Sequence, residues 1–470
     1  MKGKTIIELT DVKTKKKEVL KDDNLVTDVL EKILTLNPNG LLTNISKDTF
    51  YPIVEKIVGG ILLFKDKITE DKNTSFVSTS NECIGYAGQV EGVQENPLQG
   101  SFNKQESKAT SNGYKFVWDF GTSKANGKIS SVCLTNGDIT LNVRVAGVYI
   151  ENGKVLMSRH KNSTFKNLPG GRIKLGEDKY LIKNTDTEMK KKYVNVVEAN
   201  FEENYIVSIV PESDYLRIIK SREPLLNFRL DDSLSFLAEK NITETKIKYK
   251  KSYGTYGVCI YVDAENYYLL KTSTSGGNTN VTKLKINKAN NSIEETEFTL
   301  ENVKIENIGG YSLDYDYYRT IKSVLRGGYV YAVSTDEKYV VKFAINNPVD
   351  VTKIEPKFTL KTGSVSSHTT GCGMYILGDM IIGTNFTIDK NDKVTEIAQS
   401  DLSTIECIPL SYGPFLLGYF ANGESSGDKY LRKVLYLITP YSATINNLSK
   451  TVEKTADKTM KITYYLTGGK

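Results

Sequence analysis

The chain of 470 residues is poor in the residues that most catalytic and metal sites need. It has two histidines, His160 and His368, and a single tryptophan, and its five cysteines never occur at CxxC spacing. This scarcity argues against a disulfide framework and a structural zinc site. A Cys/His dyad of His368 with Cys372 is conceivable, but both residues fall in one loop with no orienting acid nearby, so we expect two ordinary loop residues.

Long hydrophobic runs and an excess of one charge are also missing. The longest nearly apolar stretch, Ile57–Phe64, is far too short to span a bilayer, and the first residues lack the apolar core of a secretory signal. The 62 basic residues are offset by 56 acidic ones, a net charge of +6. We therefore expect no nucleic-acid partner and no membrane insertion. With so few histidines and no paired cysteines we also expect no metal and no cofactor, in a protein made in the cytoplasm.

What the chain does have is strand-type alternation. Phe116, Trp118 and Phe120 alternate with polar or small residues, and a Gly/Ser/Asn-rich connection leads to a second apolar run ending at Leu134. This pattern predicts a two-stranded antiparallel hairpin whose aromatic side chains form the core or an interface of its domain. Near the carboxyl end, Met460–Leu466 alternates in the same way and predicts another strand with one buried face.

The first hundred residues mix strand and helix signals. A lysine-rich turn divides the run Lys4–Val19 and predicts a hairpin. Apolar residues at three- and four-residue spacing then predict a helix over Leu25–Leu34, with Asp23 or Asn24 as its N-cap. A second short helix is expected over Phe50–Val58, followed by a strand at Ile61–Phe64. The amino-terminal region is therefore expected to be a small α+β unit.

The middle of the chain is predicted to form a long succession of β-strands. From about Arg144 valine- and tyrosine-rich runs recur, separated by turns such as Asp263–Asn266 and Asp389–Asp392. Loose repeats of about four strands predict a β-propeller-like module, with a β-sandwich as the alternative. The fold class is therefore expected to be mainly β.

Three stretches carry a resemblance to a known family. They are Tyr114–Asn136 (YKFVWDFGTSKANGKISSVCLTN), the opening Thr5–Leu30 with Phe50–Lys65, and the ending Thr444–Leu466. Together they resemble tail-fibre and baseplate appendage proteins, of the receptor-binding type, from phages and phage-tail-like bacteriocins of Gram-positive bacteria. The resemblance covers roughly the first 140 and the last 30 residues. It implies that the final strand belongs with the amino-terminal unit.

Residues 1–143 are accordingly expected to form an adaptor that attaches to the particle, 144–439 a carried module, and 440–470 a carboxy-terminal strand that completes the adaptor. The resemblance implies a virion or tail-like particle as the location, other tail or baseplate proteins and host cell-surface polysaccharide as partners, and a homo-oligomer, with a trimer as one form. We expect a binding protein rather than an enzyme. A glycan depolymerase on the same scaffold and a purely structural baseplate component are the alternatives.

A cluster of tyrosines is the best ligand-binding candidate. Within nine residues it combines aromatic rings, two carboxylates and a guanidinium, groups that suit sugar rings and hydroxyls. Its members are Tyr311, Asp314, Tyr315, Asp316, Tyr317, Tyr318 and Arg319. The alternative is an ordinary strand with tyrosines on both faces.

One enzyme-like stretch, Val145–Asp178, resembles the front of a Nudix hydrolase, with Gly171 and Glu177 opening the motif. The family's two metal-binding glutamates are replaced by Met189 and Lys190. A Mg²⁺ site needs clustered oxygen ligands, so we expect no Nudix activity and interpret this stretch as a propeller hairpin.

Overall fold

A computed structural model describes most of the chain. It describes residues 1–30, 58–77, 81–89, 96–137, 147–151, 154–158, 171–182, 195–223, 241–249, 258–305, 322–362, 373–377, 380–396, 408–423 and 429–468, together with residues 92, 188, 192–193 and 225. The regular secondary structure of the described part is almost entirely β-strand, and the chain divides into two compact units. Unit 1 comprises Met1–Ile173 with Leu437–Lys470, and unit 2 comprises Lys174–Tyr436.

Unit 1 is built on one ten-stranded antiparallel sheet and a separate hairpin. The sheet contains β1 (Lys2–Asp11), β2 (Lys17–Val26), β3 (Gly60–Phe64), β4 (Cys83–Ala87), β5 (Ser101–Phe102), β6 (Lys108–Thr110), β7 (Gly113–Phe120), β8 (Gly127–Thr135), β31 (Thr444–Lys454) and β32 (Lys458–Thr467). The hairpin contains β9 (Gly147–Glu151) and β10 (Lys154–Ser158). The sheet order is β4-β3-β8-β31-β2-β1-β32-β7-β5, with β6 also on β7.

The two edges of this sheet meet. The Tyr86 amide in β4 donates to the Leu98 carbonyl (2.9 Å), and the Gly100 amide, just before β5, donates to the Tyr86 carbonyl (2.8 Å). The sheet therefore curls until its first and last strands touch, and side chains of one face are enclosed. Trp118, Phe116 and Tyr464 are fully buried inside it.

The carboxy-terminal strand returns to the amino-terminal sheet, as expected. β32 lies between β1 and β7 along its whole length, with Ile462 opposite both Ile7 and Trp118. Its buried residues are the four expected from alternation: Met460, Ile462, Tyr464 and Leu466.

Two local expectations were wrong. β7 and β8 both exist, but they do not pair with each other: β7 pairs with β32, and β8 lies between β3 and β31. The predicted helix also does not begin at Leu25, because Leu25 and Val26 are the last residues of β2 and pair with β31. The expected N-cap residues, Asp23 and Asn24, lie in the same strand. Residues 28–30 are helical; the rest of that helix, and Phe50–Val58 except its last residue, lie outside the described residues.

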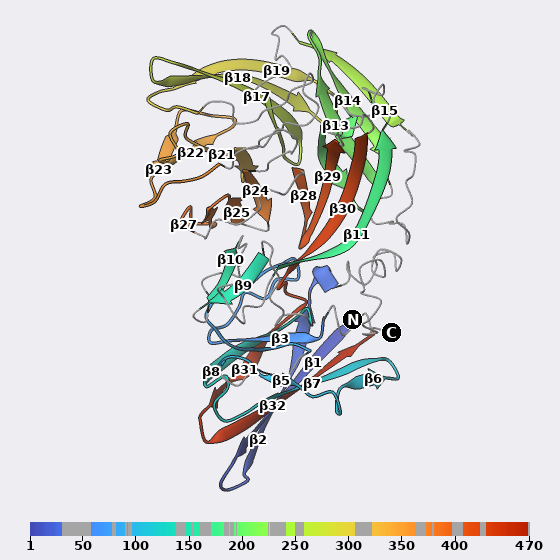
Figure 1. Cartoon of the computed structure of the whole chain (residues 1–470), viewed down its shortest axis with the longest axis vertical. Coiled ribbons are helices and arrows are strands. Elements are labelled where there is room, and N and C mark those ends of the chain that lie inside the picture. The colour runs from blue at the N-terminus through green and yellow to red at the C-terminus, as the bar shows by residue number, and fades with distance from the viewer. Residues whose placement is uncertain are drawn as a thin grey trace. The chain divides into compact units, whose positions relative to one another are not determined.

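Unit 2 consists of five four-stranded antiparallel sheets in the described part of the chain, arranged in a ring (Figure 1). Blade 1 contains β12 (Val196–Asn200), β13 (Tyr205–Pro211), β14 (Tyr215–Arg222) and β15 (Asn241–Lys248), and blade 2 contains β16 (Val258–Val262), β17 (Asn266–Ser275), β18 (Asn278–Asn287) and β19 (Ile293–Leu300). Blade 3 contains β20 (Ser323–Arg326), β21 (Tyr329–Val333), β22 (Val340–Ala344) and β23 (Val351–Ile354), and blade 4 contains β24 (Met374–Leu377), β25 (Met380–Gly383), β26 (Phe386–Ile388) and β27 (Val394–Glu396). Blade 5 contains β28 (Ile408–Tyr412), β29 (Phe415–Gly423), β30 (Lys429–Thr439) and β11 (Gly171–Ile182).

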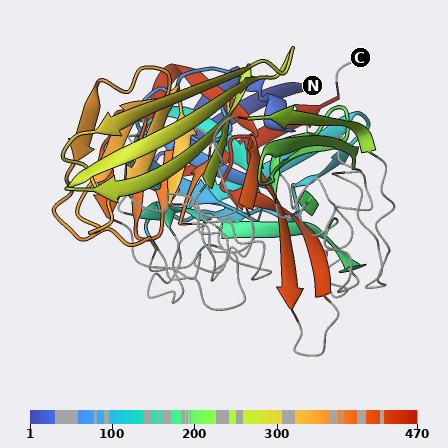
Figure 2. The same cartoon turned by 90° about the horizontal axis from the view of Figure 1, so that it is seen from above.

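The first strands of the blades close the ring. β12 contacts β16, and the contacts continue through β20, β24 and β28 back to β12. Figure 2 shows the long strands of blade 2, in yellow, twisting as one sheet. Apolar cores fill the seams between successive blades, such as the cluster around Phe343 between blades 2 and 3. Unit 2 is therefore a five-bladed β-propeller, and the sandwich alternative was wrong.

Blade 5 joins the beginning and the end of the propeller. Its outer strand β11 comes from the start of the module and ends at Ile182, whereas the other three strands of the blade begin only at Ile408. β11 pairs with β30. The chain thus enters and leaves the propeller through two adjacent strands. This makes the propeller an insertion into unit 1, although the expected roles of adaptor and carried module stay a prediction.

Candidate functional site

Successive strands of a blade run in opposite directions, so the turns between them lie alternately at the two rims of the propeller. In blades 1 to 4 the first and third turns lie at one rim, and the second turn lies at the other together with the connection to the next blade. We call the latter the connection rim. Its described turns include residues 212–214 of blade 1, Gly276–Gly277 of blade 2, residues 334–339 of blade 3 and residues 384–385 of blade 4. Loops carried on a rigid scaffold are the usual place for binding residues.

The predicted tyrosine cluster, Tyr311–Arg319, belongs to the connection from β19 to β20 and lies outside the described residues. Its role stays a prediction. The beginning of this connection is described and held firmly. The Lys304 carbonyl accepts hydrogen bonds from the Thr335 amide (2.9 Å) and hydroxyl (3.2 Å), and the Lys304 amide donates to the Tyr339 hydroxyl (3.3 Å). The turn of blade 3 therefore anchors the base of the segment.

The same turn anchors the next connection. Glu337 has a left-handed backbone, with φ 58°, and its Oε1 accepts from the Thr362 amide (3.1 Å) and hydroxyl (2.8 Å). On blade 4, the Asn385 side chain binds the Lys361 amide (2.8 Å) through its oxygen. The connections that follow blades 2 and 3 are therefore both hydrogen-bonded to turns of the connection rim.

Polar clusters span the seams on the opposite rim. Between blades 3 and 4, Asp392 accepts from the Tyr331 hydroxyl (2.7 Å) and from Arg326 Nη2 (2.9 Å), and Lys342 Nζ also binds it. Burial raises the pKa of Asp392, but the donors, led by Lys342, outweigh it and hold that pKa below its ordinary value. The carboxylate therefore stays ionised and links the two blades.

The seam between blades 1 and 2 uses the same chemistry. Glu198 Oε2 accepts from Lys288 Nζ (2.8 Å) and from the Tyr267 hydroxyl (3.1 Å), and the Lys288 ammonium lies 4.8 Å from the centre of the Tyr267 ring. Between blades 2 and 3 the buried Lys283 donates across the seam to the Ile345 carbonyl (3.0 Å). Tyrosine hydroxyls and cations therefore connect blades that share apolar cores.

A buried ionic cluster accompanies ring closure. Lys433 of β30 has no exposed surface, and its Nζ lies 3.1 Å from Asp178 of β11 and 3.7 Å from Glu223, which follows β14 of blade 1. The Tyr193 hydroxyl donates to Glu223 (3.2 Å). Burial raises the pKa of Glu223, with Lys433 opposing that shift. This cluster joins the closing strand, its neighbour and the first blade.

Sequence reasoning missed this cluster, although it left a signal. Lys433 directly precedes the apolar run Val434–Ile438 of β30, and it is as buried as Val434 and Leu435. A charge inside such a strand indicates a buried partner.

The other predicted residues fall into two groups. Phe116, Trp118 and Phe120 are at most 1% exposed in the core of unit 1, and their part in attachment stays a prediction. His160, His368 and Cys372 lie outside the described residues. The described part of the Nudix-like stretch does not form the expected propeller hairpin: β9 and β10 pair only with each other and belong to unit 1, whereas Gly171–Ile182, including Glu177, is one continuous strand of blade 5. Where side chains are described, no group of three His, Cys, Asp or Glu residues is placed to hold a metal ion.

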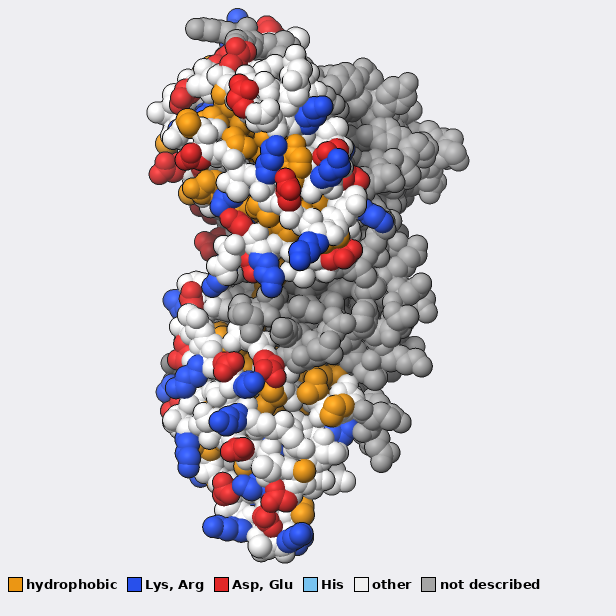
Figure 3. Space-filling model, turned by 90° about the vertical axis from the view of Figure 1, so that its left-hand side faces the viewer, with side chains coloured by type: hydrophobic (Ala, Val, Ile, Leu, Met, Phe, Trp, Pro, Cys, Tyr) orange, Lys and Arg blue, Asp and Glu red, His pale blue; other side chains and the backbone are white. Residues whose placement is uncertain are grey.

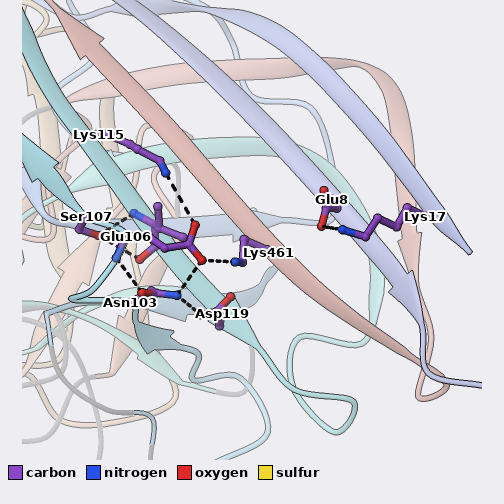
Figure 4. A network of polar contacts seen from close by, with 9 residues as sticks. Glu8, Lys17, Asn103, Glu106, Ser107, Lys115, Asp119 and Lys461 are labelled. Carbon is purple, nitrogen blue, oxygen red and sulfur yellow. Dashed lines mark hydrogen bonds and ion pairs between the residues drawn. The ribbon is translucent and has the colours of Figure 1, made fainter. Parts of the chain in front are cut away.

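On the outside of the unit 1 sheet, Glu106 lies between Lys115 and Lys461 (Figure 4). Asn103, three residues earlier, donates to Asp119 (2.7 Å), so the segment 103–107 is fastened across β7 and β32. On the face in Figure 3, acidic and basic side chains are interspersed among the residues coloured by type, rather than gathered in a stripe of one sign. Among the described helical residues, none forms a helix long and apolar enough to cross a membrane.

No protein-family model matches the chain, and no curated protein matches its sequence. Solved structures with some similarity include a functionally unknown protein from Desulfotomaculum acetoxidans, at 11% identity and a TM-score of 0.25, covering 84% of this chain and 98% of that one. Apo AztD from Citrobacter koseri follows at 10% identity and a TM-score of 0.24, covering 87% and 99%. Similarity at this level supports no functional argument.

Proposed function

We propose that this protein is a receptor-binding appendage of a phage tail or a phage-tail-like particle. Unit 1 attaches it to the particle, and the propeller binds polysaccharide on the host cell surface. The observation that carries the proposal is the insertion of a closed propeller into a curled sheet through two adjacent strands, β11 and β30. A module inserted in this way can vary without disturbing the sheet that carries it.

The resemblance to appendage proteins supports the role of unit 1. The three stretches that carry it contribute β1, β2, β3, β7, β8, β31 and β32, all strands of a single sheet. Segments far apart in the chain therefore belong to one body, as an attachment domain requires. Several copies on one particle would add avidity to a weak individual site.

We assign polysaccharide binding to the connection rim, and we expect Tyr311–Arg319 to provide the main contact. The anchoring of this connection through Lys304 and Thr335 supports the assignment, because a contact segment loses less entropy on binding when its base is already held.

The test is cosedimentation of the purified full chain with intact Gram-positive cells, before and after chemical removal of their surface polysaccharide. We expect binding that is lost with the polysaccharide. The double substitution Tyr315→Ala and Tyr317→Ala should weaken binding about tenfold or more, with an unchanged melting temperature. No binding to any host strain that the particle infects would reject the proposal.

The same experiment separates the alternatives. Shortened polysaccharide chains in the supernatant would indicate the depolymerase instead. For the purely structural alternative, deleting Val145–Thr439 would abort particle assembly, whereas our proposal expects assembled particles that fail to adsorb.

A further inference from the structure

One lysine of unit 1 is buried against neutral groups. Lys454, the last residue of β31, is 1% exposed, and its Nζ donates to Asn126 Oδ1 (2.8 Å) and to the Thr122 carbonyl (3.3 Å). An ammonium group loses its hydration on burial, and neutral oxygens compensate for that loss only in part. Burial accordingly lowers the pKa of Lys454 to about 8. A large share of this amine is therefore neutral, and so nucleophilic, in mildly alkaline solution.

The carboxamide beside this amine lies on a strained turn. Ala125 has a left-handed backbone, with φ 51°, and Gly127 has φ 140°, so unusual conformations flank Asn126 on both sides. The Ala125 amide fastens the turn by donating to the Pro97 carbonyl (2.8 Å). Strained residues persist only where their surroundings hold them, and they are concentrated at functional positions. The turn therefore holds the Asn126 carboxamide against Lys454.

The two side chains come from neighbouring strands that are far apart in sequence. Lys454 pairs with Gly127 in the ladder between β31 and β8, so Lys454 and Asn126 are adjacent across that ladder. They stand 328 positions apart, and the whole of unit 2 lies between them in the chain. Asn126 is exposed, which gives a small leaving group a path to solvent.

We propose that Lys454 and Asn126 form an intramolecular isopeptide bond. The bond between Lys454 Nζ and Asn126 Cγ forms, the bond between Cγ and Nδ2 of the carboxamide breaks, and ammonia leaves with the proton that the lysine gives up. The net reaction converts an ammonium group and a carboxamide into an amide and an ammonium ion, with no oxidant or reductant. The folded structure supplies the proximity that the reaction needs, and the reaction removes a buried charge.

The bond closes a covalent loop that contains β8, the propeller and β31. Closing so long a loop restricts the unfolded chain, so unit 1 should unfold less readily once the bond has formed. Until then Lys454 is still a titratable amine, and freshly made protein keeps the pH dependence that this amine confers. The inference does not depend on the proposed function.

The experiment measures the intact mass of the purified full chain, freshly made and after incubation in mildly alkaline buffer. We expect a species that is lighter by the mass of one ammonia molecule. Its fraction should grow during incubation, because the neutral amine is the reacting form. Tryptic digestion should then yield one peptide in which the segments of Asn126 and Lys454 are joined, with no cleavage after Lys454.

Variants locate the reaction. Lys454→Arg keeps a cation but offers no nucleophilic amine, and Asn126→Ala removes the carboxamide, so neither should form the joined peptide. Lys128→Met is the matched control, because Lys128 is an exposed lysine just after the same turn and should leave the loss of ammonia unchanged.

An unchanged mass of the unmodified chain after incubation overturns the inference, whether or not the variants fold. Loss of ammonia that persists in Lys454→Arg also overturns it, because the Gly127 amide can itself attack the Asn126 carboxamide and form a succinimide without any lysine. Conversion of Asn126 to aspartate without a joined peptide has the same meaning. None of these results bears on binding to host cells, which tests the proposed function.

Discussion

Each unit of the protein buries a lysine, and the two surroundings differ. In the propeller, Lys433 is enclosed with two carboxylates, Asp178 at 3.1 Å and Glu223 at 3.7 Å. In unit 1, Lys454 is 1% exposed and donates to neutral oxygens, Asn126 Oδ1 (2.8 Å) and the Thr122 carbonyl (3.3 Å).

Both units close by pairing strands that are distant in sequence, but they bury different neighbours beside the lysine. In unit 1 the hydrogen-bond partners of Lys454 are neutral oxygens, in a sheet with an apolar, aromatic interior. In the closing blade of the propeller, Lys433 lies beside two carboxylates. We therefore expect charge removal to damage the propeller and loss of apolar volume to damage unit 1.

Removing the propeller's buried cation should have one of the largest effects. Lys433→Met would leave Asp178 and Glu223 buried without their cation, a loss of about 3–5 kcal/mol in the free energy of unfolding. Denaturant unfolding followed by circular dichroism measures it. Trp118, the only tryptophan, lies in unit 1, so its fluorescence reports that unit separately. A fluorescence transition that moves as much as the dichroism would contradict the assignment of the effect to the propeller.

Removing apolar volume from unit 1 should have an effect of similar size. Trp118→Ala deletes a fully buried ring and the hydrogen bond from its Nε1 to the Gly59 carbonyl (3.2 Å), a loss of about 3–5 kcal/mol. Circular dichroism should show a shifted unit 1 transition. The matched control is Val19→Ala, because that side chain is 52% exposed on the same sheet and should change stability very little.

Adding volume to unit 1 should cost less. A Cβ on Gly3 would lie 2.1 Å from the buried Tyr464 hydroxyl, so Gly3→Ala forces the ring to move and should lower stability by about 1–3 kcal/mol. The double variant with Tyr464→Phe removes the clashing oxygen and should recover part of the loss. Fluorescence-detected unfolding measures both, and no difference between them would reject the proposed clash.

The last prediction concerns how the stability of unit 1 depends on pH. Burial lowers the pKa of Lys454 from its ordinary 10.5 to about 8, with Asp457 opposing the shift. Between these values the unfolded chain binds more protons than the folded one, so the free energy of unfolding should rise as pH increases from about 8 to 10.5. Lys454→Met should remove that rise. An unchanged pH profile in this variant would show that Lys454 is not its source.

Local patterns in the sequence identified individual strands well. The alternation of Met460–Leu466 predicted which side chains of β32 are buried, and the turn chemistry at Asp389–Asp392 predicted a connection between two strands. The seams were not predictable in this way. Asp392 looks like an ordinary turn residue, yet its partners Arg326 and Lys342 stand some fifty or more positions earlier in the chain.

By itself, the sequence determined where strands form and which face of each is apolar, because alternation depends on neighbouring residues alone. Only the tertiary structure decided which strands pair. Tyr114–Asn136 has the pattern of a hairpin, but β7 instead joins β32, β8 joins β31 and β3, and Trp118 is fully buried in the resulting sheet. Ring closure by β11 was decided in the same way, since an edge strand's partner depends on the free edge that the rest of the fold presents.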